Sequence, residues 1–292
     1  LLLFPLNKVL INALNGLRHM RMYAMAQALR YVFIILALVT LVTLGAESVQ
    51  LPVILSASEC LLLILLLGYF LWIRALSVKA LTREWIKKHI SFAIRSLPSG
   101  LFLDLNTKVD ILMLGYFAND GEVGVYAFAA MLSEALGMLV HAVRANLTPI
   151  LSRLKVENRQ GEAKQLARGA MRLLCPVLLF AGLLGTVLYS VVVEHLTGSE
   201  ELASGSMYFS ILMVGISLSA GYISIMFILN QWGEPHWFSL YSGVVVVTNI
   251  FLNALLIPVV GETGAALATA LSMLLSVAYL KLMTRRVTGV LI

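Results

Sequence analysis

Charged side chains interrupt several stretches of this sequence that are otherwise apolar, and the stretch at residues 91–117 holds the most of them. Its charged and amide members are Arg95, Asp104, Asn106, Lys108 and Asp110. A charge inside a hydrocarbon layer is costly, so such residues usually face a hydrated cavity and bind a substrate or an ion. In a continuous helix, Asp104 and Lys108 lie one turn apart, while the other three share a stripe on roughly the opposite side. We predict that neither stripe faces lipid, although an Asp104–Lys108 ion pair that only fastens helices is the alternative.

The next apolar stretch, residues 122–151, adds three ionisable side chains. Glu134 and His141 are seven residues apart, a spacing that puts both on one face of a helix, and Arg144 lies beside them. Arg144 either lines a cavity on that face or extends to the nearby cytoplasmic interface. His141 is explained more simply by a hydrogen bond between helices than by proton transfer.

Two earlier apolar stretches each hold a charged residue, Arg30 in the first and Glu59 in the second. With the residues above, they predict a hydrated central cavity that carries charges of both signs. Pro98 and Gly100 are expected to loosen the first turns of the helix at 91–117, as in transporter helices that bend around a cavity.

The elements that carry these residues are predicted to be membrane-spanning helices. Hydrophobic residues make up 60% of the 292 residues, charged residues only 12%, and the mean hydropathy is +0.92. No aqueous core absorbs that much apolar surface, whereas each bilayer helix needs about 20 apolar residues in a row. We therefore expect an all-α polytopic membrane protein. Its full spans are predicted at 20–45, 51–73, 91–117, 122–151, 166–193, 206–230, 236–258 and 262–283, with the end of another at 1–14.

The positions of Lys and Arg predict the orientation, because basic residues in short loops stay on the cytoplasmic side. Four segments rich in basic residues are assigned to the cytoplasm, at 8–21, 74–88, 153–172 and 281–286. Four segments without Lys or Arg are assigned to the outside, at 46–50, 118–122, 194–201 and 260–262. The net charge of +6 is therefore a topology signal, and no nucleic-acid partner is expected.

The ends of the chain and its internal organisation carry further predictions. The chain opens on Leu1 within an apolar run, so we interpret it as a piece that lacks N-terminal helices. Residues 284–292 form either a cytoplasmic tail or the start of a further helix. The segments that follow Asn15 and Asn230 each contain an apolar span and a second apolar helix that ends in a basic cluster. They fit a parallel repeat, although any two helical hairpins look alike.

We predict no catalytic residue, cofactor or metal site. A membrane enzyme of polysaccharide assembly usually has a large loop with paired carboxylates or a metal cluster, whereas the longest polar stretches here are basic. The sequence has no Walker A motif, so ATP hydrolysis is not expected. Cys60 and Cys175 lie in apolar runs and are interpreted as small hydrophobic residues.

Short motifs along the chain resemble those of a known transporter family. They are Asp104-Leu-Asn-Thr-Lys-Val-Asp110, Leu114-Gly115, Val123-Gly124-Val-Tyr126 and Pro149, then Gly233-Glu-Pro235, Asn249, Asn253, Pro258 and Gly261-Glu-Thr-Gly264-Ala265-Ala266-Leu-Ala268-Thr269. On these residues the chain resembles the Wzx-type polysaccharide flippases, which move O-antigen and other lipid-linked oligosaccharides. These flippases belong to the multidrug/oligosaccharidyl-lipid/polysaccharide exporter superfamily. The likeness covers essentially the whole chain.

This resemblance implies a fold of two six-helix lobes around a central cavity. Residues 1–73 then form the latter part of the N-terminal lobe, 74–90 the cytoplasmic linker between lobes, and 91–283 the complete C-terminal lobe. The resemblance also implies a secondary-type transporter, not an enzyme, in the bacterial cytoplasmic membrane. Its implied substrate is an oligosaccharide on undecaprenyl pyrophosphate, moved by alternating access. Other membrane proteins of polysaccharide assembly are candidate partners.

The resemblance further suggests roles for the charged residues. A pyrophosphate needs cationic partners, and the candidates for head-group binding are Arg30, Arg95, Lys108 and Arg144. The candidates for proton or sodium coupling are Asp104, Asp110, Glu134 and Glu59. A cation-coupled multidrug exporter of the same superfamily is the alternative, and its cavity should present acids and aromatic residues rather than buried cations. A catalytic or non-catalytic membrane component of polysaccharide assembly is the third possibility.

Overall fold

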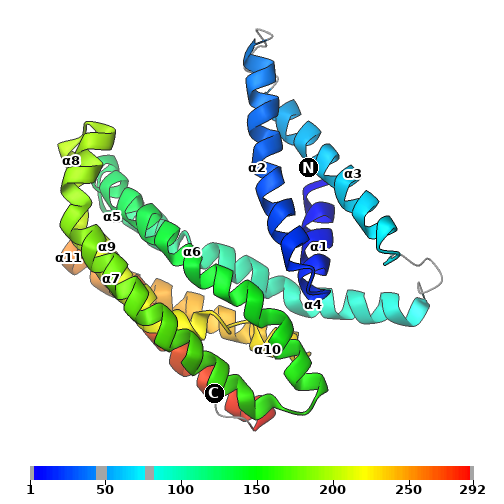
Figure 1. Cartoon of the computed structure of the whole chain (residues 1–292). Helices are drawn as coiled ribbons and strands as arrows, with labels where there is room; N and C mark the ends of the chain where they lie inside the picture. The colour runs from blue at the N-terminus through cyan, green and yellow to red at the C-terminus, as the bar shows by residue number, and fades with distance from the viewer. Residues whose placement is uncertain (1–2, 44–50, 76–81, 290–292) are drawn as a thin grey trace. The chain divides into compact units, whose positions relative to one another are not determined.

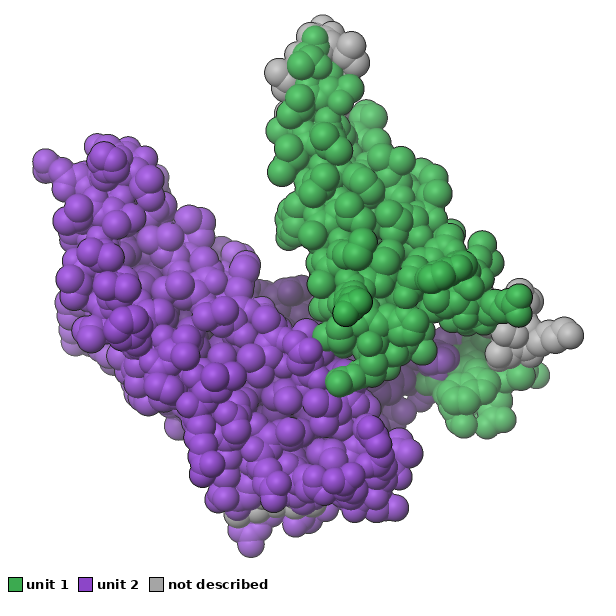
Figure 2. All heavy atoms as spheres, viewed as in Figure 1, with its two compact units in different colours: residues 1–88 green, residues 89–292 purple. Residues whose placement is uncertain are grey.

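The protein is helical throughout the part of the chain that the computed structural model describes, which is residues 3–43, 51–75 and 82–289 (Figure 1). No strand occurs in these residues, which confirms the all-α prediction. The chain divides into two compact units, residues 1–88 and residues 89–292, which Figure 2 shows in different colours.

Some predicted features lie outside the described residues. These are the whole predicted outward segment 46–50, part of the predicted linker 74–90 and the end of the predicted tail 284–292. The lobe and linker boundaries drawn from the sequence therefore stay a prediction.

Unit 1 is a bundle of three long helices. They are α1 (Leu3–Gly16), α2 (Met20–Thr43) and α3 (Leu51–Trp72). The three helices pack on one another around fully buried leucines, among them Leu14 and Leu62. The opposite face of α2 is apolar yet exposed, as at Tyr31 and Ile35. An exposed apolar face of this length suits contact with hydrocarbon rather than with water.

Unit 2 contains the remaining helices, of which α4 begins before the boundary between the units. They are α4 (Arg83–Asn106), α5 (Val109–Phe117), α6 (Asp120–Val156), the 3-10 turn η3 (Gln160–Glu162), α7 (Ala163–Thr197), α8 (Glu200–Ala203), α9 (Ser206–Ile223), α10 (Ile228–Gln231) and α11 (Pro235–Thr288). α9 packs against α6, α7 and α11, and α5 packs against α11. α9 is thus the helix around which unit 2 is assembled.

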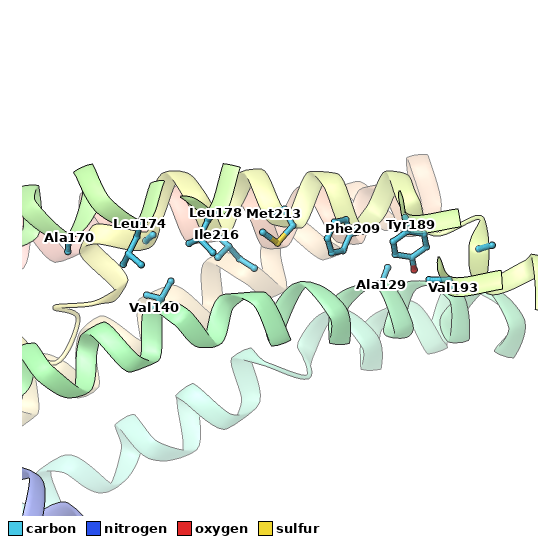
Figure 3. Close-up of a cluster of buried hydrophobic side chains, with 12 residues drawn as sticks. Ala129, Val140, Ala170, Leu174, Leu178, Tyr189, Val193, Phe209, Met213 and Ile216 are labelled. Carbon is cyan, nitrogen blue, oxygen red and sulfur yellow. The ribbon is translucent and has the colours of Figure 1, made fainter. Parts of the chain in front are cut away.

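An extended apolar core joins α7 and α9, which run side by side (Figure 3). Leu178 and Tyr189 of α7 pack with Phe209 and Met213 of α9, and the rings of Tyr189 and Phe209 lie 5.5 Å apart between centroids. Val140 of α6 belongs to the same core. This packing fixes α6, the helix that carries Glu134, His141 and Arg144.

Six segments of the described chain are long and apolar enough to cross a membrane. They are found in α2, α3, α6, α7, α9 together with α10, and α11. This observation supports the predicted multi-pass membrane protein. α6 and α7 extend beyond the spans predicted at 122–151 and 166–193, because both helices continue into the polar hairpin that joins them.

Ion pairs hold the hairpin between α6 and α7, which is predicted to be cytoplasmic. Arg153 Nε donates to Glu157 Oε1 at 2.5 Å, and Arg159 Nη1 donates to Glu157 Oε2 at 3.0 Å. The hydrogen bond from Arg153 is the main reason that the pKa of the Glu157 carboxyl falls below its ordinary value, and Arg159 lowers it further. Because these groups are exposed, the ion pairs stabilise the hairpin only weakly.

The sequence predicts one continuous span where the structure has α4 and α5, but the chain breaks at Thr107 and Lys108. Thr107 Oγ1 donates to the Asp104 carbonyl at 2.8 Å, and the Lys108 amide donates to a carbonyl three residues earlier at 2.9 Å. These local bonds compete with the helical pattern and close the end of α4. The predicted stacking of Asp104 on Lys108 and the predicted shared stripe are therefore wrong. α4 stays helical at Pro98 and Gly100, and the loosening lies nearer to the middle of the span.

α11 also contains a break, at Val260 and Gly261, which divides it into two helices. Gly261 has φ 57° and ψ −135°, a conformation that only glycine adopts readily. A Cβ atom at Gly264 would lie 2.4 Å from the Leu256 carbonyl oxygen, so only a hydrogen fits there. The break predicted between the last two spans is confirmed, and the two glycines are the physical reason for its sharpness.

Candidate functional site

Unit 2 contains a cavity of about 420 Å³ between the end of α4, α5, α6, α9 and both halves of α11. This volume lies within the usual range of small-molecule sites, roughly 300–1,000 Å³. Apolar and aromatic side chains share the lining with hydroxyl and amide groups. The ionisable side chains that line it are Asp104, Asp110, Glu134, His141, Arg144 and Tyr241. A cavity of this composition inside a membrane-spanning unit is the natural candidate for an ion or substrate site.

Asp110 is the most deeply buried acid of this cavity, with 7% of its surface exposed. Its carboxylate oxygen Oδ2 accepts a hydrogen bond from Tyr126 Oη at 2.5 Å and a longer one from Thr269 Oγ1 at 3.3 Å. Its Oδ1 accepts from the Ile111 amide at 2.9 Å. Asp110 lies in the first turn of α5, where backbone amides and the helix dipole favour a negative charge. The break before α5 creates this helix start and so positions the carboxylate.

All three donors to Asp110 are neutral, and none of the ion pairs found among the described residues includes it. Hydrogen bonds from neutral donors stabilise the ionised form but leave the charge itself uncompensated. A buried carboxylate in this setting attracts a cation. Within the described residues, no three His, Cys, Asp or Glu side chains come together as a metal cluster, so oxygen atoms of neutral groups would complete such a site.

A row of three asparagines connects α4 with α11 beside the cavity. Asn249 Nδ2 donates to the carbonyl and side-chain oxygens of Asn106, at 3.4 and 3.3 Å. Asn253 Nδ2 donates to both oxygens of Asn249 at 2.9 Å. Asn249 and Asn253 are completely buried, and Asn253 Oδ1 is buried without a hydrogen-bond partner. A buried acceptor without a donor is rare and costs free energy, so this oxygen is available to a cation or a water molecule.

Arg144 is the one guanidinium on the cavity lining. It donates through Nη1 to Met226 Sδ at 3.3 Å, and its Cζ lies 5.1 Å from the ring centroid of Phe227. A guanidinium over an aromatic face is stabilised by cation–π attraction. Glu134 and His141, on the same helix as Arg144, also line the cavity. The predicted common face of Glu134 and His141 therefore corresponds to the cavity side of α6.

The structure brings together four of the eight predicted site residues. Asp104, Asp110, Glu134 and Arg144 line the cavity of unit 2. The other two predicted residues of unit 2 do not line it. Arg95 is exposed and its Nε donates to the Ser91 carbonyl at 3.1 Å, and Lys108 is an exposed side chain immediately before α5.

The two predicted site residues of unit 1 contact each other. Arg30 Nε lies 3.0 Å from Glu59 Oε1, and both side chains are largely buried. The sequence interpretation gave Arg30 to substrate binding and Glu59 to ion coupling, without pairing them. In the described structure their charges neutralise each other.

The sequence interpretation missed Tyr126 and Thr269 as partners of Asp110, and Asn249 as a lining residue. All three occur in the motifs that carried the family resemblance, but none is ionised at neutral pH, and a hydroxyl or amide in a helix is common. The available signal was the spacing of Asn249 and Asn253, which places two amides one turn apart on one face of an otherwise apolar helix.

Two family models match the chain. The model described as polysaccharide biosynthesis protein matches residues 1–155, more than half of the 292 residues. The model described as MatE matches residues 99–255. The two matches overlap and together reach from the start of unit 1 into α11.

Two curated relatives come from Haloferax volcanii. One is named as the probable flippase AglR and is 30% identical over 171 residues, which are 57% of this chain and 35% of that protein. The other is named as the probable low-salt glycan biosynthesis flippase Agl15 and is 24% identical over 164 residues, which are 56% of this chain and 34% of that protein. The matches thus span about a third of the length of these relatives.

Solved structures of the Vibrio cholerae MATE transporter VcmN have the same fold. A mutant of VcmN matches with a TM-score of 0.75 and the bent form with 0.72, each at 14% identity over 90% of this chain and 61% of the VcmN chain. This likeness supports the predicted two-lobe transporter fold. The family assignment rests on the match over residues 1–155. The chain belongs to the polysaccharide biosynthesis protein family, which agrees with the predicted resemblance to the polysaccharide flippases of the multidrug/oligosaccharidyl-lipid/polysaccharide exporter superfamily.

Proposed function

We propose that the protein is a flippase that moves an oligosaccharide linked to undecaprenyl pyrophosphate across the bacterial cytoplasmic membrane. It acts as a secondary transporter by alternating access and uses cation entry to drive the cycle. The observation that carries this proposal is Asp110, a buried carboxylate on the wall of the cavity, whose hydrogen-bond donors are all neutral. The names of both Haloferax volcanii relatives support flipping, and the name of Agl15 supports the glycan part of the proposal.

The coupling cation binds at Asp110. A proton or a sodium ion would neutralise the buried charge. Its release would restore the desolvation cost of an isolated carboxylate in the membrane. Thr269 comes from the second half of α11, whereas Asp110 and Tyr126 come from α5 and α6. Occupancy of the site therefore changes the forces between helices, which is how a bound ion selects one of two transporter conformations.

The head group binds to basic residues. The candidates are Arg30, Arg95, Lys108 and Arg144, because a pyrophosphate needs charge-assisted hydrogen bonds. The cavity of unit 2 holds three acids and one guanidinium, so its charge suits the cation better than it suits a pyrophosphate. We therefore rank Arg30, which lies in unit 1, first among the four.

One observation favours the alternative function, a cation-coupled multidrug exporter. Asp104, Asp110 and Glu134 share the cavity lining with the aromatic residues Phe102, Phe227 and Tyr241. Acids beside aromatic rings are the groups that recognise organic cations. The match to the MatE family model agrees with this alternative. The third possibility, a membrane component of polysaccharide assembly without transport, has no support in the cavity.

The experiment uses the protein reconstituted in vesicles with a fluorescent undecaprenyl-pyrophosphate oligosaccharide, with and without a sodium or proton gradient. We expect flipping to accelerate under the gradient and this acceleration to be lost in Asp110→Asn. Asp120→Asn, the same change at an exposed carboxylate outside the cavity, is the matched control and should behave as wild type. Gradient-driven efflux of cationic dyes without glycolipid flipping would instead assign the protein to multidrug export, and the absence of both would end the transporter proposal.

A further inference from the structure

A compact cluster in unit 1 consists of four side chains, Arg30, Glu59, Asn7 and Phe4. Arg30 belongs to α2, Glu59 to α3, and Asn7 and Phe4 to α1, so the cluster joins all three helices. Asn7 is fully buried, Glu59 is 8% exposed, and the Arg30 side chain is 14% exposed. Among the described residues, Glu59 and Asp110 are the two charged residues classed as buried.

Glu59 is held more tightly than Arg30 within this cluster. Asn7 Nδ2 donates to the carbonyl oxygen of Glu59 at 2.7 Å and to its carboxylate Oε2 at 2.7 Å. One amide thus clamps both the backbone and the side chain of Glu59. These two bonds keep the carboxylate in place whether or not Arg30 is bound to it.

Arg30 is paired with Glu59 by charge but poorly by hydrogen bonding. Its Nε lies 3.0 Å from Glu59 Oε1 but makes no hydrogen bond with that oxygen or with any other acceptor. Its Nη2 reaches Glu59 Oε2 only at 3.5 Å. A well-formed Arg–carboxylate pair has two parallel bonds of about 2.7–2.9 Å. The guanidinium is therefore neutralised while part of its donor capacity stays unused.

Phe4 fixes the plane of the guanidinium. Arg30 Cζ lies 4.7 Å from the centroid of the Phe4 ring, which is the geometry of a cation–π contact. A guanidinium supported on one face by a ring keeps its edge free for hydrogen bonds.

We propose that Arg30 is a masked site for the phosphate group of the substrate, and that Glu59 is the built-in anion which the phosphate must displace. This inference deepens the proposed function and rests on its substrate class, a lipid-linked pyrophosphate. A phosphate carries more charge than a carboxylate and presents several acceptor oxygens, so it satisfies the donors that Glu59 leaves unused. Asn7 holds Glu59 during the exchange, and Phe4 holds Arg30.

The masking has a functional consequence. An isolated buried arginine would be costly in a transporter that returns empty, and the ion pair with Glu59 removes this cost when no substrate is bound. When the phosphate binds Arg30, Glu59 loses its counter-charge. By linkage, anion binding at Arg30 favours neutralisation of Glu59 by a proton, and neutralisation of Glu59 strengthens anion binding by the same factor.

The competing interpretation is an ion pair that only fastens α2 to α3. That reading predicts that loss of Glu59 harms the fold and leaves anion affinity unchanged or weakened. The masked-site reading predicts the opposite sign for affinity. The two are therefore separated by one binding measurement on folded protein.

The experiment measures binding of farnesyl pyrophosphate and of inorganic pyrophosphate to the purified protein in lipid nanodiscs by titration calorimetry. Glu59→Gln should tighten binding about 5- to 150-fold, the range of typical coupling between two sites. Arg30→Gln should abolish binding, alone and combined with Glu59→Gln. Glu157→Gln, the same change at an exposed ion-paired glutamate, is the matched control and should bind like wild type.

The two probes distinguish the source of the phosphate. Tighter binding of both shows that the phosphate chemistry alone is recognised, whereas tighter binding of farnesyl pyrophosphate alone shows that the lipid is needed. Either result supports the masked site. An Arg30→Gln protein that still binds the probe, or a folded Glu59→Gln protein with unchanged or weaker affinity, would overturn it.

Asn7→Ala provides a second test in case Glu59→Gln does not fold. This variant keeps the ion pair and removes only the hydrogen bonds from Asn7 that hold Glu59. It should tighten binding by less than Glu59→Gln, and unchanged or weaker affinity would again count against the masked site. Glycolipid flipping is measured separately on the same variants. If flipping is intact but Glu59→Gln does not bind the probes more tightly, this inference alone is overturned. If Glu59→Gln binds more tightly and Arg30→Gln does not bind, but no flipping occurs, the proposed function alone is overturned.

Discussion

The contact between Tyr126 and Asp110 can be tested by a double-mutant cycle. Tyr126 is fully buried, and its hydroxyl donates to Asp110 Oδ2 at 2.5 Å. Tyr126→Phe removes the donor with little change in shape, and Asp110→Leu removes the acceptor. The free energies of unfolding of wild type, the two single variants and the double variant give the interaction energy of the pair.

The size of this energy reports whether Asp110 is ionised. A hydrogen bond between neutral groups in a membrane protein contributes about 0.6 kcal/mol on average. A hydrogen bond to a charged group contributes about 1.5–3 kcal/mol. We argue that Asp110 is ionised and ready for a cation, so we expect the larger value. In a unit of this size, about 1.5–3 kcal/mol corresponds to a fall in Tm of about 3–12 °C for Tyr126→Phe.

The assay is unfolding of the purified protein in mixed micelles, followed by circular dichroism, in a buffer without sodium. Thr269→Val provides the matched comparison, because the Thr269 hydroxyl contacts the same oxygen at 3.3 Å and should couple to Asp110 more weakly. An interaction energy near 0.6 kcal/mol for the Tyr126 pair would refute the reasoning, since it would mean that Asp110 already holds a proton and is not an open site for sodium.

Two further predictions concern stability. Gly264→Ala should destabilise the protein by about 1–3 kcal/mol or more, because the new Cβ would meet the Leu256 carbonyl at 2.4 Å, whereas Gly100→Ala has open space around it and should be neutral or stabilising in the same unfolding assay. Because the pKa of Glu157 is lowered in the folded hairpin, its contribution to stability is present above its ordinary value of 4.5 and disappears as the pH falls through the lower folded value. Glu157→Gln should therefore reduce Tm slightly at neutral pH and not at acidic pH, and an equal loss at both would contradict this assignment.

Hydropathy alone predicted where the chain crosses the membrane, because a long apolar run is a local property of the sequence. Seven of the eight predicted full spans fall on the six candidate membrane segments of the described residues, two of them on α11, whose break lies at Gly261 as predicted. The span predicted at 91–117 is instead divided between α4 and α5. Helix ends were less predictable. α6 continues to Val156 and α7 begins at Ala163, since charged residues outside the hydrocarbon can still be helical. Hydropathy measures burial in lipid and does not measure helix length.

The break between α4 and α5 depends on the local bonds of Thr107 and Lys108 and also on a tertiary contact that its own segment does not reveal. Asn106, at the end of α4, accepts hydrogen bonds from Asn249, which is 143 residues away in sequence. A local reading of the charged segment assumes a continuous helix and so pairs Asp104 with Lys108. The tertiary contact favours a helix that ends at Asn106, and the restart at Val109 gives Asp110 its place in the first turn of α5.

The buried charges of the two units differ in one respect that bears on mechanism. Glu59 in unit 1 has a cationic partner in Arg30, whereas Asp110 in unit 2 has neutral donors only. An anion that binds in unit 1 exchanges one partner of Arg30 for another, and a cation that binds in unit 2 supplies a charge that is missing. Anion binding in unit 1 leaves Glu59 without its counter-charge. Without cation binding in unit 2, anion binding therefore costs little free energy only if Glu59 is neutralised by another group. A transporter that carries an anionic lipid with a cation therefore gains from having both sites, since each site limits the number of uncompensated charges during a cycle.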